Sequence, residues 1–355
     1  MKENVGLFVK IYCNSSSLTS SKGSLWVKGL GFRVMHAVQY DSYGGGTSGL
    51  QHTEVPIPSP KTDEFYLLGG IYFFESYLGW LVGLLPLADG TIGTALDVAG
   101  EIVKVGKGVE RFKAGDKVVA VLSFLIGGGL AEYAVASQRL TASRPPEVLA
   151  AEGAGLPSCG LTAHQAVTQA AGIKLDKTGQ LKNVLITGAT GGIGHYAVQL
   201  AKLGNTHVTA TCGARNIEIV KSLGADEVLD YKTPDGAALK SPSGLKYDIV
   251  IHCAPTTIPW SIFEPNLSEN GKVINLTPGL FAYISYVVKI LTFSKKKLVP
   301  FFVNPKGDNL DSLVKLMKEG KLKTVIDSKH PLSKAEDAWA KGIDGPCTGK
   351  IIVEQ

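Results

Sequence analysis

Hydrophobic residues between positions 181 and 277 occur in short continuous runs that polar or Gly-rich segments separate. The runs are Asn183–Thr187, His207–Thr211, Glu227–Tyr231, Tyr247–His252 and Lys272–Thr277. Each is five or six residues long and most are rich in β-branched residues, which is typical of strands buried on both faces of a parallel sheet. An amphipathic helix from about Ile193 to Leu203 follows the first run, and helical or turn segments follow the others. This alternation predicts an α/β fold with a doubly wound parallel sheet of the Rossmann type.

A Gly-rich turn connects the first predicted strand to the first predicted helix. The sequence from Thr187 to Gly194 reads TGATGGIG, with a G-x-x-G-x-x-G spacing and one additional glycine. Small residues there let the main chain approach a pyrophosphate, whose charge the helix N-terminus then stabilises. The strand, loop, helix and strand context predicts a dinucleotide site rather than a turn that is Gly-rich by chance. The predicted contact residues are Gly188, Thr190, Gly191, Gly192, Ile193 and Gly194.

The end of the second predicted strand indicates which dinucleotide is bound. An NAD site carries an Asp or Glu about 20 residues beyond the glycine loop, on the ribose 2′-hydroxyl. Here the chain reads Thr211-Cys-Gly-Ala-Arg215, with no carboxylate before Glu218. Because an arginine can form charge-assisted hydrogen bonds with a 2′-phosphate, Arg215 favours NADP over NAD. The alternative for Arg215 is an ordinary exposed residue at the start of a helix.

Further candidate cofactor contacts lie at or just beyond the carboxyl ends of the remaining strands, since ligands of doubly wound sheets bind at that edge. These candidates are Tyr231, Cys253, Ala254, Thr277 and Gly279. Cys253 is interpreted as a small packing residue, because the sequence shows no His or Asp arrangement that would activate it as a nucleophile.

Composition narrows the class of protein. Length predicts two domains, at about 150 residues each. Glycine makes up 42 of the 355 residues, against about 7% in average proteins, which indicates tight turns or close approach of the main chain to a ligand. The net charge of +5 is spread over 36 basic and 31 acidic side chains, which is too dilute for a nucleic-acid binder. Five scattered cysteines argue against a disulfide framework and for a reducing compartment.

Two segments near the start of the chain differ from the rest. Residues 1–34 carry four Lys and one Arg against a single Glu, with six Ser between Ser15 and Ser24. Such a segment is typical of an organelle transit peptide, and the alternative is a disordered or wrongly assigned start. Residues 65–87 contain one charged side chain, Glu75, over 23 residues. They have the length and apolarity of a bilayer span, although their glycines, a proline and the mid-segment Glu75 favour strands and helices of a buried core.

A second apolar stretch, residues 280–303, contains the basic run Lys295-Lys-Lys297. One interpretation is a peripheral contact with anionic lipid. The other, which we prefer, assigns the stretch to the cofactor domain and the subunit contact beside its sheet.

Metal ligands do not cluster in the sequence. The seven histidines are dispersed, and no two cysteines lie within 40 residues of each other. A zinc site needs convergent Cys, His or carboxylate ligands, so the sequence predicts a protein without a metal site. The glycine loop also fits the T-G-x-x-x-G-x-G pattern of short-chain dehydrogenases. That family carries the loop near its N-terminus and a later Tyr-x-x-x-Lys, and this chain has neither.

Several motifs in order resemble the medium-chain dehydrogenase/reductase superfamily and cover residues 96–355. They are Asp97–Val109, Phe112–Val119, Gly127–Tyr133, Leu161–Ala166 and Thr348–Val353. Within that superfamily the chain is similar to the zinc-free quinone oxidoreductases, and through Ala210–Asn216 and Pro265–Asn270 to their plant chloroplast-envelope members. Zinc alcohol dehydrogenases of the superfamily have a His-Glu pair just before the glycine that matches Gly100, where this chain has Leu96 and Asp97.

The resemblance implies an NADPH-dependent enzyme that transfers hydride, without a metal, to the conjugated double bond of an enone or to a quinone. It implies a chaperonin-10-like substrate domain over residues 35–159 and 321–355, an NADP-binding Rossmann domain over 160–320, and Thr162 and Lys350 as further cofactor contacts. Tyr43 is a weak candidate for the catalytic cleft. The implied partner is a small-molecule substrate, the implied assembly a monomer or homodimer, and the implied location the chloroplast, with the cytoplasm as the alternative.

One departure from the family leaves a second reading open. Its members carry an Asn-Pro-x-Asp core whose side chains line the nicotinamide and substrate pocket, and residues 65–95 of this chain lack it. The alternative function is therefore an NADPH-binding protein with impaired catalysis, associated with a membrane through the apolar segment.

Overall fold

The computed structural model describes residues 34–40, 46–74, 95–123, 128–278, 291–292, 294–345 and 347–355. These residues belong to two compact units. The first contains the described residues up to Gly155, together with Ser328–Gly345 and Ile351–Gln355. The second contains Leu156–Asp327 and the described residues of Pro346–Lys350. The domain limits expected from the sequence differ from these by several residues and stay a prediction.

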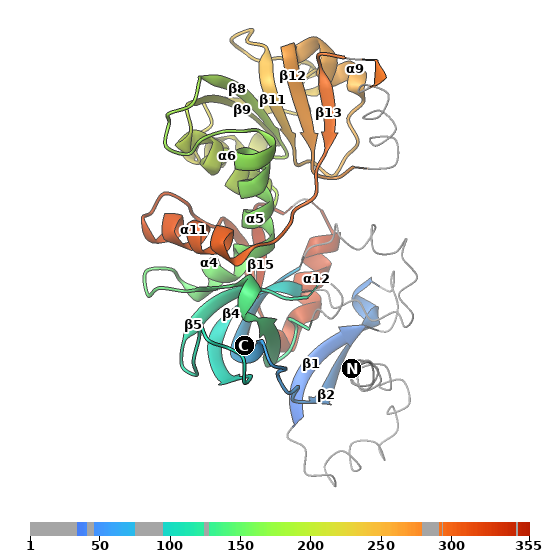
Figure 1. Ribbon diagram of the computed structural model, residues 1–355. Coiled ribbons are helices and arrows are strands. Elements are labelled where there is room, and N and C mark those ends of the chain that lie inside the picture. Colours follow the sequence, from blue (N-terminus) through green and yellow to red (C-terminus); the bar gives the residue numbers. More distant parts are fainter. Residues whose placement is uncertain are drawn as a thin grey trace. The chain divides into compact units, whose positions relative to one another are not determined.

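A six-stranded parallel sheet forms the centre of the second unit (Figure 1). Its strands in spatial order are β10 (Glu227–Asp230), β9 (Thr206–Cys212), β8 (Lys182–Thr187), β11 (Tyr247–His252), β12 (Leu267–Asn275) and β13 (Lys297–Pro300). In chain order this is the 3-2-1-4-5-6 arrangement of dinucleotide-binding folds. The central strand β8 is buried on both faces, since Val184, Leu185 and Ile186 are fully inaccessible to solvent. The predicted doubly wound sheet is confirmed.

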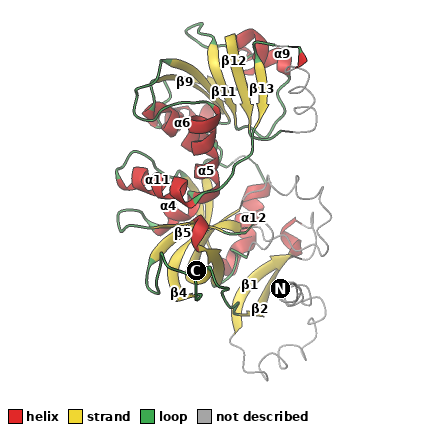
Figure 2. Ribbon diagram, in the orientation of Figure 1, coloured by secondary structure: helices red, strands yellow, loops and turns green. Residues whose placement is uncertain are grey.

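Helices pack against the strands of this sheet, and Figure 2 shows α6 and α9 beside them. The helical segments of the unit are α5 (Pro157–Gln165), η4 (Ala166–Ala170), α6 (Gly194–Leu203), η5 (Ala214–Asn216), α7 (Ile217–Ser222), α8 (Pro234–Ala237), α9 (Trp260–Phe263), η6 (Glu264–Asn266) and α11 (Gly307–Lys318). One core cluster packs Leu185 and Val250 of the sheet against Phe263 of α9. Burial of such side chains contributes about 1.5–3 kcal/mol each, which holds the helices on the strands.

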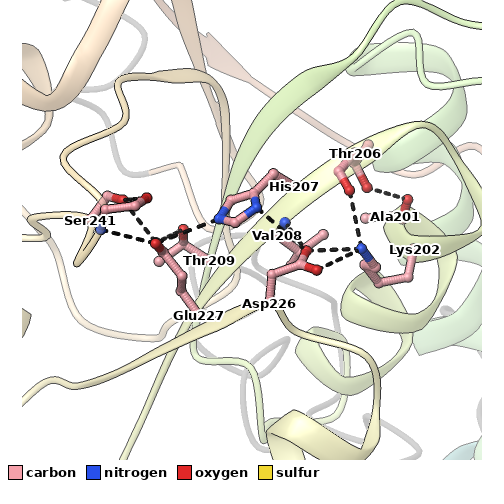
Figure 3. Close-up of polar contacts among 10 residues, drawn as sticks. Ala201, Lys202, Thr206, His207, Val208, Thr209, Asp226, Glu227 and Ser241 are labelled. Atoms are coloured by element: carbon pink, nitrogen blue, oxygen red, sulfur yellow. Dashed lines mark hydrogen bonds and ion pairs between the residues drawn. The ribbon is translucent and has the colours of Figure 1, made fainter.

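A polar network joins β9 and β10 at their amino ends, the edge of the sheet opposite the glycine loop (Figure 3). His207 lies between two carboxylates, 3.6 Å from Glu227 and 4.0 Å from Asp226. Asp226 accepts from the main-chain N–H of Val208 and pairs with Lys202 of α6 at 2.8 Å. Glu227 accepts hydrogen bonds from Thr209, Ser241 and Ser243. These contacts fix the edge strand β10 in register on β9.

The first unit is built on a seven-stranded sheet in which β3 pairs antiparallel with β15, β4 and β6, and β5 pairs antiparallel with β4 and β7. Its strands are β14 (Ile326–Pro331), β15 (Lys350–Glu354), β3 (Glu64–Phe74), β4 (Ala95–Val105), β5 (Lys117–Val121) and β7 (Thr141–Ser143), with β6 (Tyr133–Ser137) paired to β3. A separate antiparallel pair consists of β1 (Val34–Tyr40) and β2 (Leu50–Pro56). Helical segments are η2 (Gly46–Gly49), η3 (Gln138–Leu140), α4 (Ala150–Gly155), η7 (Leu332–Lys334) and α12 (Ala335–Ile343).

The apolar segment at residues 65–87 enters this sheet. Its first ten residues lie in β3, which pairs with β4, β6 and β15, and Phe65 and Leu67 are buried in the core. Residues 65–74 therefore form a strand with Phe65 and Leu67 in the core, as the preferred interpretation expects, while residues 75–87 lie outside the described part. Within that described part, no helix has the length and apolarity to cross a membrane.

Other predictions fall on parts of the chain that the structure does not describe. These are the segment 1–33, residues 280–290 and 293 of the second apolar stretch, and the candidates Tyr43 and Gly279. The rest of that second stretch includes β13, the edge strand of the parallel sheet, as expected for a part of the cofactor domain.

Candidate dinucleotide-binding site

The predicted glycine loop follows β8 and is fastened to the neighbouring strand β9. Gly188 adopts a φ of 63°, a left-handed conformation that favours glycine. Its N–H donates to the hydroxyl of Thr211 at 3.2 Å, and the N–H of Ala189 donates to the Thr211 carbonyl at 2.9 Å. The N–H of Gly191 returns to the carbonyl of Gly188 at 3.0 Å and closes the turn. The loop is thus held in one conformation before any ligand arrives.

Close packing of the main chain explains two of the glycines. A Cβ on Gly188 would lie 3.0 Å from the main chain of Ala254, which follows β11 by two residues. A Cβ on Gly194 would overlap the carbonyl oxygen of Gly188 and lie 2.9 Å from Ala189 Cα. The loop therefore folds tightly onto the first turn of α6, whose N-terminal N–H groups form an anion site. This geometry fits the pyrophosphate of a dinucleotide, and Ala254, a predicted cofactor contact, lies beside the loop.

The end of β9 forms the neighbouring part of the site. Cys212 is followed by Gly213 and then by Arg215, an exposed residue in η5. The ring of Tyr231 lies next to Gly213, because a Cβ built there would be 3.5 Å from the Tyr231 hydroxyl. Burial raises the pKa of Cys212 to about 11, with Asp230 adding to the shift, so its thiol is neutral. Arg215 and Tyr231 thus share the edge of the sheet with the glycine loop.

A buried hydrogen-bond chain joins the ends of β8, β11 and β12. Burial lowers the pKa of His252 to about 4, although a bond to Thr256 opposes the shift, so the imidazole is neutral. Its Nε2 faces the Thr256 carbonyl at 3.1 Å and must donate, which leaves Nδ1 to accept from the Thr187 hydroxyl at 2.7 Å. The same hydroxyl accepts from the N–H of Ala254 at 3.4 Å, and Thr277 donates to the Ala254 carbonyl at 3.5 Å. Ala254 and Thr277, both predicted as cofactor contacts, therefore lie together just beyond the ends of their strands, and contact of either with a cofactor stays a prediction.

The structure describes three other residues that the sequence predicts as cofactor contacts, and their contact with a cofactor stays a prediction. Burial raises the pKa of Cys253 to about 12, which agrees with its interpretation as a packing residue. Thr162 lies in α5, where its hydroxyl donates to the carbonyl of Ser158 at 2.8 Å. Lys350 is fully buried, and its ammonium lies 3.0 Å from the sulfur of Cys159. Contact of Thr162 and Lys350 with a cofactor stays a prediction.

Sequence reasoning missed two features under the glycine loop. His195, in the first turn of α6, is fully buried; its Nδ1 donates to the Gly191 carbonyl at 2.9 Å, and burial lowers its pKa to about 3. Its Nε2 has no hydrogen-bond partner among the described residues. The segment Thr348–Gly349 also contacts the loop, since the N–H of Gly349 donates to the Thr190 carbonyl at 2.7 Å. Only the similarity of the segment to a family motif singled it out in the sequence.

Potential metal ligands do not gather in the described part of the molecule. Across those residues, no group of three or more His, Cys, Asp and Glu side chains has a geometry that could hold a metal ion. The residues that the structure describes therefore offer no ligand set for zinc.

The fold and the loop define the class of protein as a nicotinamide dinucleotide-dependent oxidoreductase, and two family models agree. Residues 80–146 match the alcohol dehydrogenase GroES-like domain, and residues 223–353 match the zinc-binding dehydrogenase domain. A chloroplast envelope quinone oxidoreductase homolog of Arabidopsis thaliana is 65% identical over 91% of this chain and 99% of its own length. A chloroplastic quinone-oxidoreductase homolog of Spinacia oleracea is 63% identical over the same shares. The chain belongs to the medium-chain dehydrogenase/reductase superfamily, among the chloroplast quinone oxidoreductase homologues.

A solved structure supports the fold independently. The quinone oxidoreductase from Coxiella burnetii superposes with a TM-score of 0.77, is 26% identical, and corresponds to 91% of this chain and 100% of that one. The resemblance found in the sequence motifs is thus confirmed both in sequence and in architecture.

Proposed function

We propose that this protein is an NADPH-dependent reductase that transfers hydride to the conjugated double bond of an enone or to a quinone, without a metal. The observation that carries the cofactor choice is the end of β9. There Cys212, Gly213 and Arg215 stand where an NAD enzyme would present a carboxylate to the ribose 2′-hydroxyl. The exposed guanidinium of Arg215 suits a 2′-phosphate.

Bound NADPH would supply the hydride, and the chain's own residues would bind and orient it. The glycine loop and the N-terminus of α6 would hold the pyrophosphate, while Arg215 and Tyr231 would surround the 2′-phosphate. Hydride addition to an enone or quinone moves the electron pair to the carbonyl oxygen, which a proton from water or a hydroxyl then neutralises. Hydrogen bonds suffice to stabilise that charge, so this chemistry needs no Lewis acid.

The names of relatives support both the cofactor and the substrates in the proposal. Besides the quinone oxidoreductase homologues, an Arabidopsis thaliana protein named NADPH-dependent alkenal/one oxidoreductase, chloroplastic, is 32% identical over 90% of this chain and 80% of its own length. We extend the NADPH, the quinone and the enone of those names to this chain, and likewise a location in the chloroplast, in the envelope or the stroma.

The cofactor choice is tested by titrating the protein with NADPH and NADH. Arg215→Ala is expected to weaken NADPH about 10- to 100-fold, as the loss of charge-assisted hydrogen bonds predicts, and to leave NADH nearly unchanged. Arg139→Ala provides a matched control, because Arg139 is also exposed and lies in the other unit. Equal affinities of the Arg215→Ala protein and the wild type for NADPH would refute the role of Arg215.

The reaction is tested by following NADPH oxidation with a panel of alkenals, enones and quinones. Turnover of at least one class is expected.

A second function remains a candidate because residues 65–95 lack the Asn-Pro-x-Asp core that lines the pocket in the family. Tight binding of NADPH without turnover of any panel member would favour this catalytically impaired NADPH-binding protein.

The proposal includes domain limits and assembly. We propose a substrate domain over 35–159 with 321–355, a cofactor domain over 160–320, and a monomer or homodimer. Limited proteolysis with mass spectrometry would map the domain limits, and light scattering after gel filtration would determine the oligomeric state.

A further inference from the structure

We propose that Thr348 is a positioning residue for the NADP-specific part of the cofactor site: it holds Asn216 and, through Asn216, the short helix η5 that carries Arg215. The inference rests on the proposed function and deepens it. Thr348 comes from a segment 132 residues further along the chain than Asn216, and no sequence motif connects the two.

The contact between Thr348 and Asn216 uses both polar atoms of the amide. The Asn216 Nδ2 donates to the Thr348 hydroxyl at 3.1 Å, and the hydroxyl donates to the Asn216 Oδ1 at 3.3 Å. Asn216 is 8% exposed, so water does not readily replace this partner. Because its amide is engaged with Thr348, Asn216 is placed to orient the turn rather than to bind the cofactor itself.

Asn216 also closes the turn in which Arg215 lies. Its main-chain N–H donates to the carbonyl of Gly213 at 2.9 Å, and it is the residue after Arg215 in η5. A fixed Asn216 therefore fixes the path of the main chain from Gly213 to Asn216. That path determines where the Arg215 side chain leaves the main chain and how far its guanidinium must reach to a 2′-phosphate.

Thr348 is itself held on both sides. Its N–H donates to Asp327 Oδ1 at 3.0 Å, and the next residue, Gly349, donates its N–H to the Thr190 carbonyl in the glycine loop. The adjacent Lys350 donates its N–H to the Val325 carbonyl at 2.9 Å. One short segment thus contacts both the pyrophosphate loop and the NADP-specific turn, and sets their spacing.

The two contacts differ in which cofactor they affect. The Gly349 contact supports the pyrophosphate loop, which NADPH and NADH share. The Thr348 side chain supports only the turn that carries Arg215, which NADH does not use. Removal of the Thr348 hydroxyl should therefore lower affinity for NADPH selectively. A general structural role would instead weaken both cofactors together.

The test compares Thr348→Val, Thr348→Ser and a matched control in calorimetric titrations with NADPH, NADH and 2′,5′-ADP. Valine keeps the shape of threonine without the hydroxyl, and serine keeps the hydroxyl. Thr168→Val is the control, because the Thr168 hydroxyl in η4 donates to the carbonyl of His164 in α5 and not to the turn that carries Arg215. Thermal melting of every variant verifies that it is folded.

The expected result is a weakening of NADPH and 2′,5′-ADP by about 5- to 10-fold in Thr348→Val, in line with one lost hydrogen bond, and a change of NADH below twofold. Thr348→Ser and Thr168→Val should bind like the wild type. In the Arg215→Ala background, Thr348→Val should cause no further loss of 2′,5′-ADP, because the hydroxyl acts through Arg215.

Two results would overturn the inference. If the wild type binds NADPH no more tightly than NADH, the proposed NADP preference fails and this inference fails with it. If the wild type prefers NADPH but Thr348→Val keeps the same ratio of NADPH to NADH affinity, or weakens both equally, the positioning role of Thr348 is wrong while the proposed function stands.

Discussion

Replacing Gly194 by alanine tests whether close packing of the glycine loop forms the cofactor site. A Cβ on Gly194 would lie 2.8 Å from the Gly188 carbonyl carbon and 2.9 Å from Ala189 Cα, and it would overlap the Gly188 oxygen. All three atoms belong to main chain that hydrogen bonds to Thr211 and Gly191 restrain. The substitution therefore has to displace the loop.

The magnitude follows from that displacement. Alanine within an unstrained helix stabilises by about 0.5–1 kcal/mol relative to glycine, so stabilisation would be expected if space existed. Overpacking instead costs about 1–3 kcal/mol, which lowers the Tm of a unit of this size by roughly 3–10 °C. A loop moved by about 1 Å no longer presents its N–H groups to the pyrophosphate, and we expect NADPH and NADH to weaken alike, by about tenfold or more.

The assay is a fluorescence titration of each cofactor together with a thermal melt. Gly179→Ala is the matched control, because Gly179 lies in the same unit and a Cβ there meets no atom within 4 Å. A Gly194→Ala protein that melts at the wild-type temperature and binds NADPH as tightly as the wild type would show that the loop has room, and would refute the reasoning.

Three further predictions concern stability and metal content. Burial alone would raise the pKa of Glu227, but hydrogen bonds from Ser243, Ser241 and Thr209 lower it to about 2. Since the pKa of Glu227 in the folded protein is depressed from 4.5, the stabilisation is complete above about pH 4.5 and is lost as pH falls toward 2. Glu227→Gln should therefore melt at a lower temperature than the wild type at pH 7, and this difference in melting temperature should disappear in acid. A difference that does not depend on pH would contradict this explanation. Tyr196→Phe removes a 2.7 Å bond to Thr324 between buried side chains and should cost about 1–3 kcal/mol in urea unfolding; an unchanged midpoint would count against that bond. Prolonged dialysis against a chelator should leave NADPH-dependent turnover unchanged, and a loss that added zinc restores would disprove the metal-free reaction.

The parallel sheet was predictable because its signals are local. The run Tyr247–His252 coincides with β11, and the predicted helix from Ile193 to Leu203 begins one residue later, at Gly194. Buried strands are continuous apolar runs, and a glycine loop between a strand and a helix has few other uses. Limits at polar positions were less accurate: β12 begins at Leu267 rather than Lys272, because its polar residues Ser268–Asn270 interrupt the apolar pattern.

The residues that hold the candidate site in place could not be predicted from the sequence. Thr348 and Asn216, or Gly349 and Thr190, meet only after the chain has folded, and neither pair shows a periodicity or spacing that would suggest the contact. The burial of Lys350 could not be predicted either, since lysine is rarely found fully buried and no sequence pattern indicates its neighbour Cys159. The predicted cofactor contacts follow local rules, whereas the residues that hold them in place depend on long-range packing.

The return of Thr348–Lys350 to the parallel-sheet unit has a consequence for biosynthesis. A ribosome makes the glycine loop, β9 and η5 long before it makes Thr348, so the nascent chain exposes a cofactor unit that still lacks one of its internal supports. Chain synthesis must proceed past β14 and α12 of the other unit before that support is available. Binding of the cofactor and completion of the two units are thus linked in time. A fragment ending at Asp327 would permanently lack the support that Thr348 provides to the binding unit.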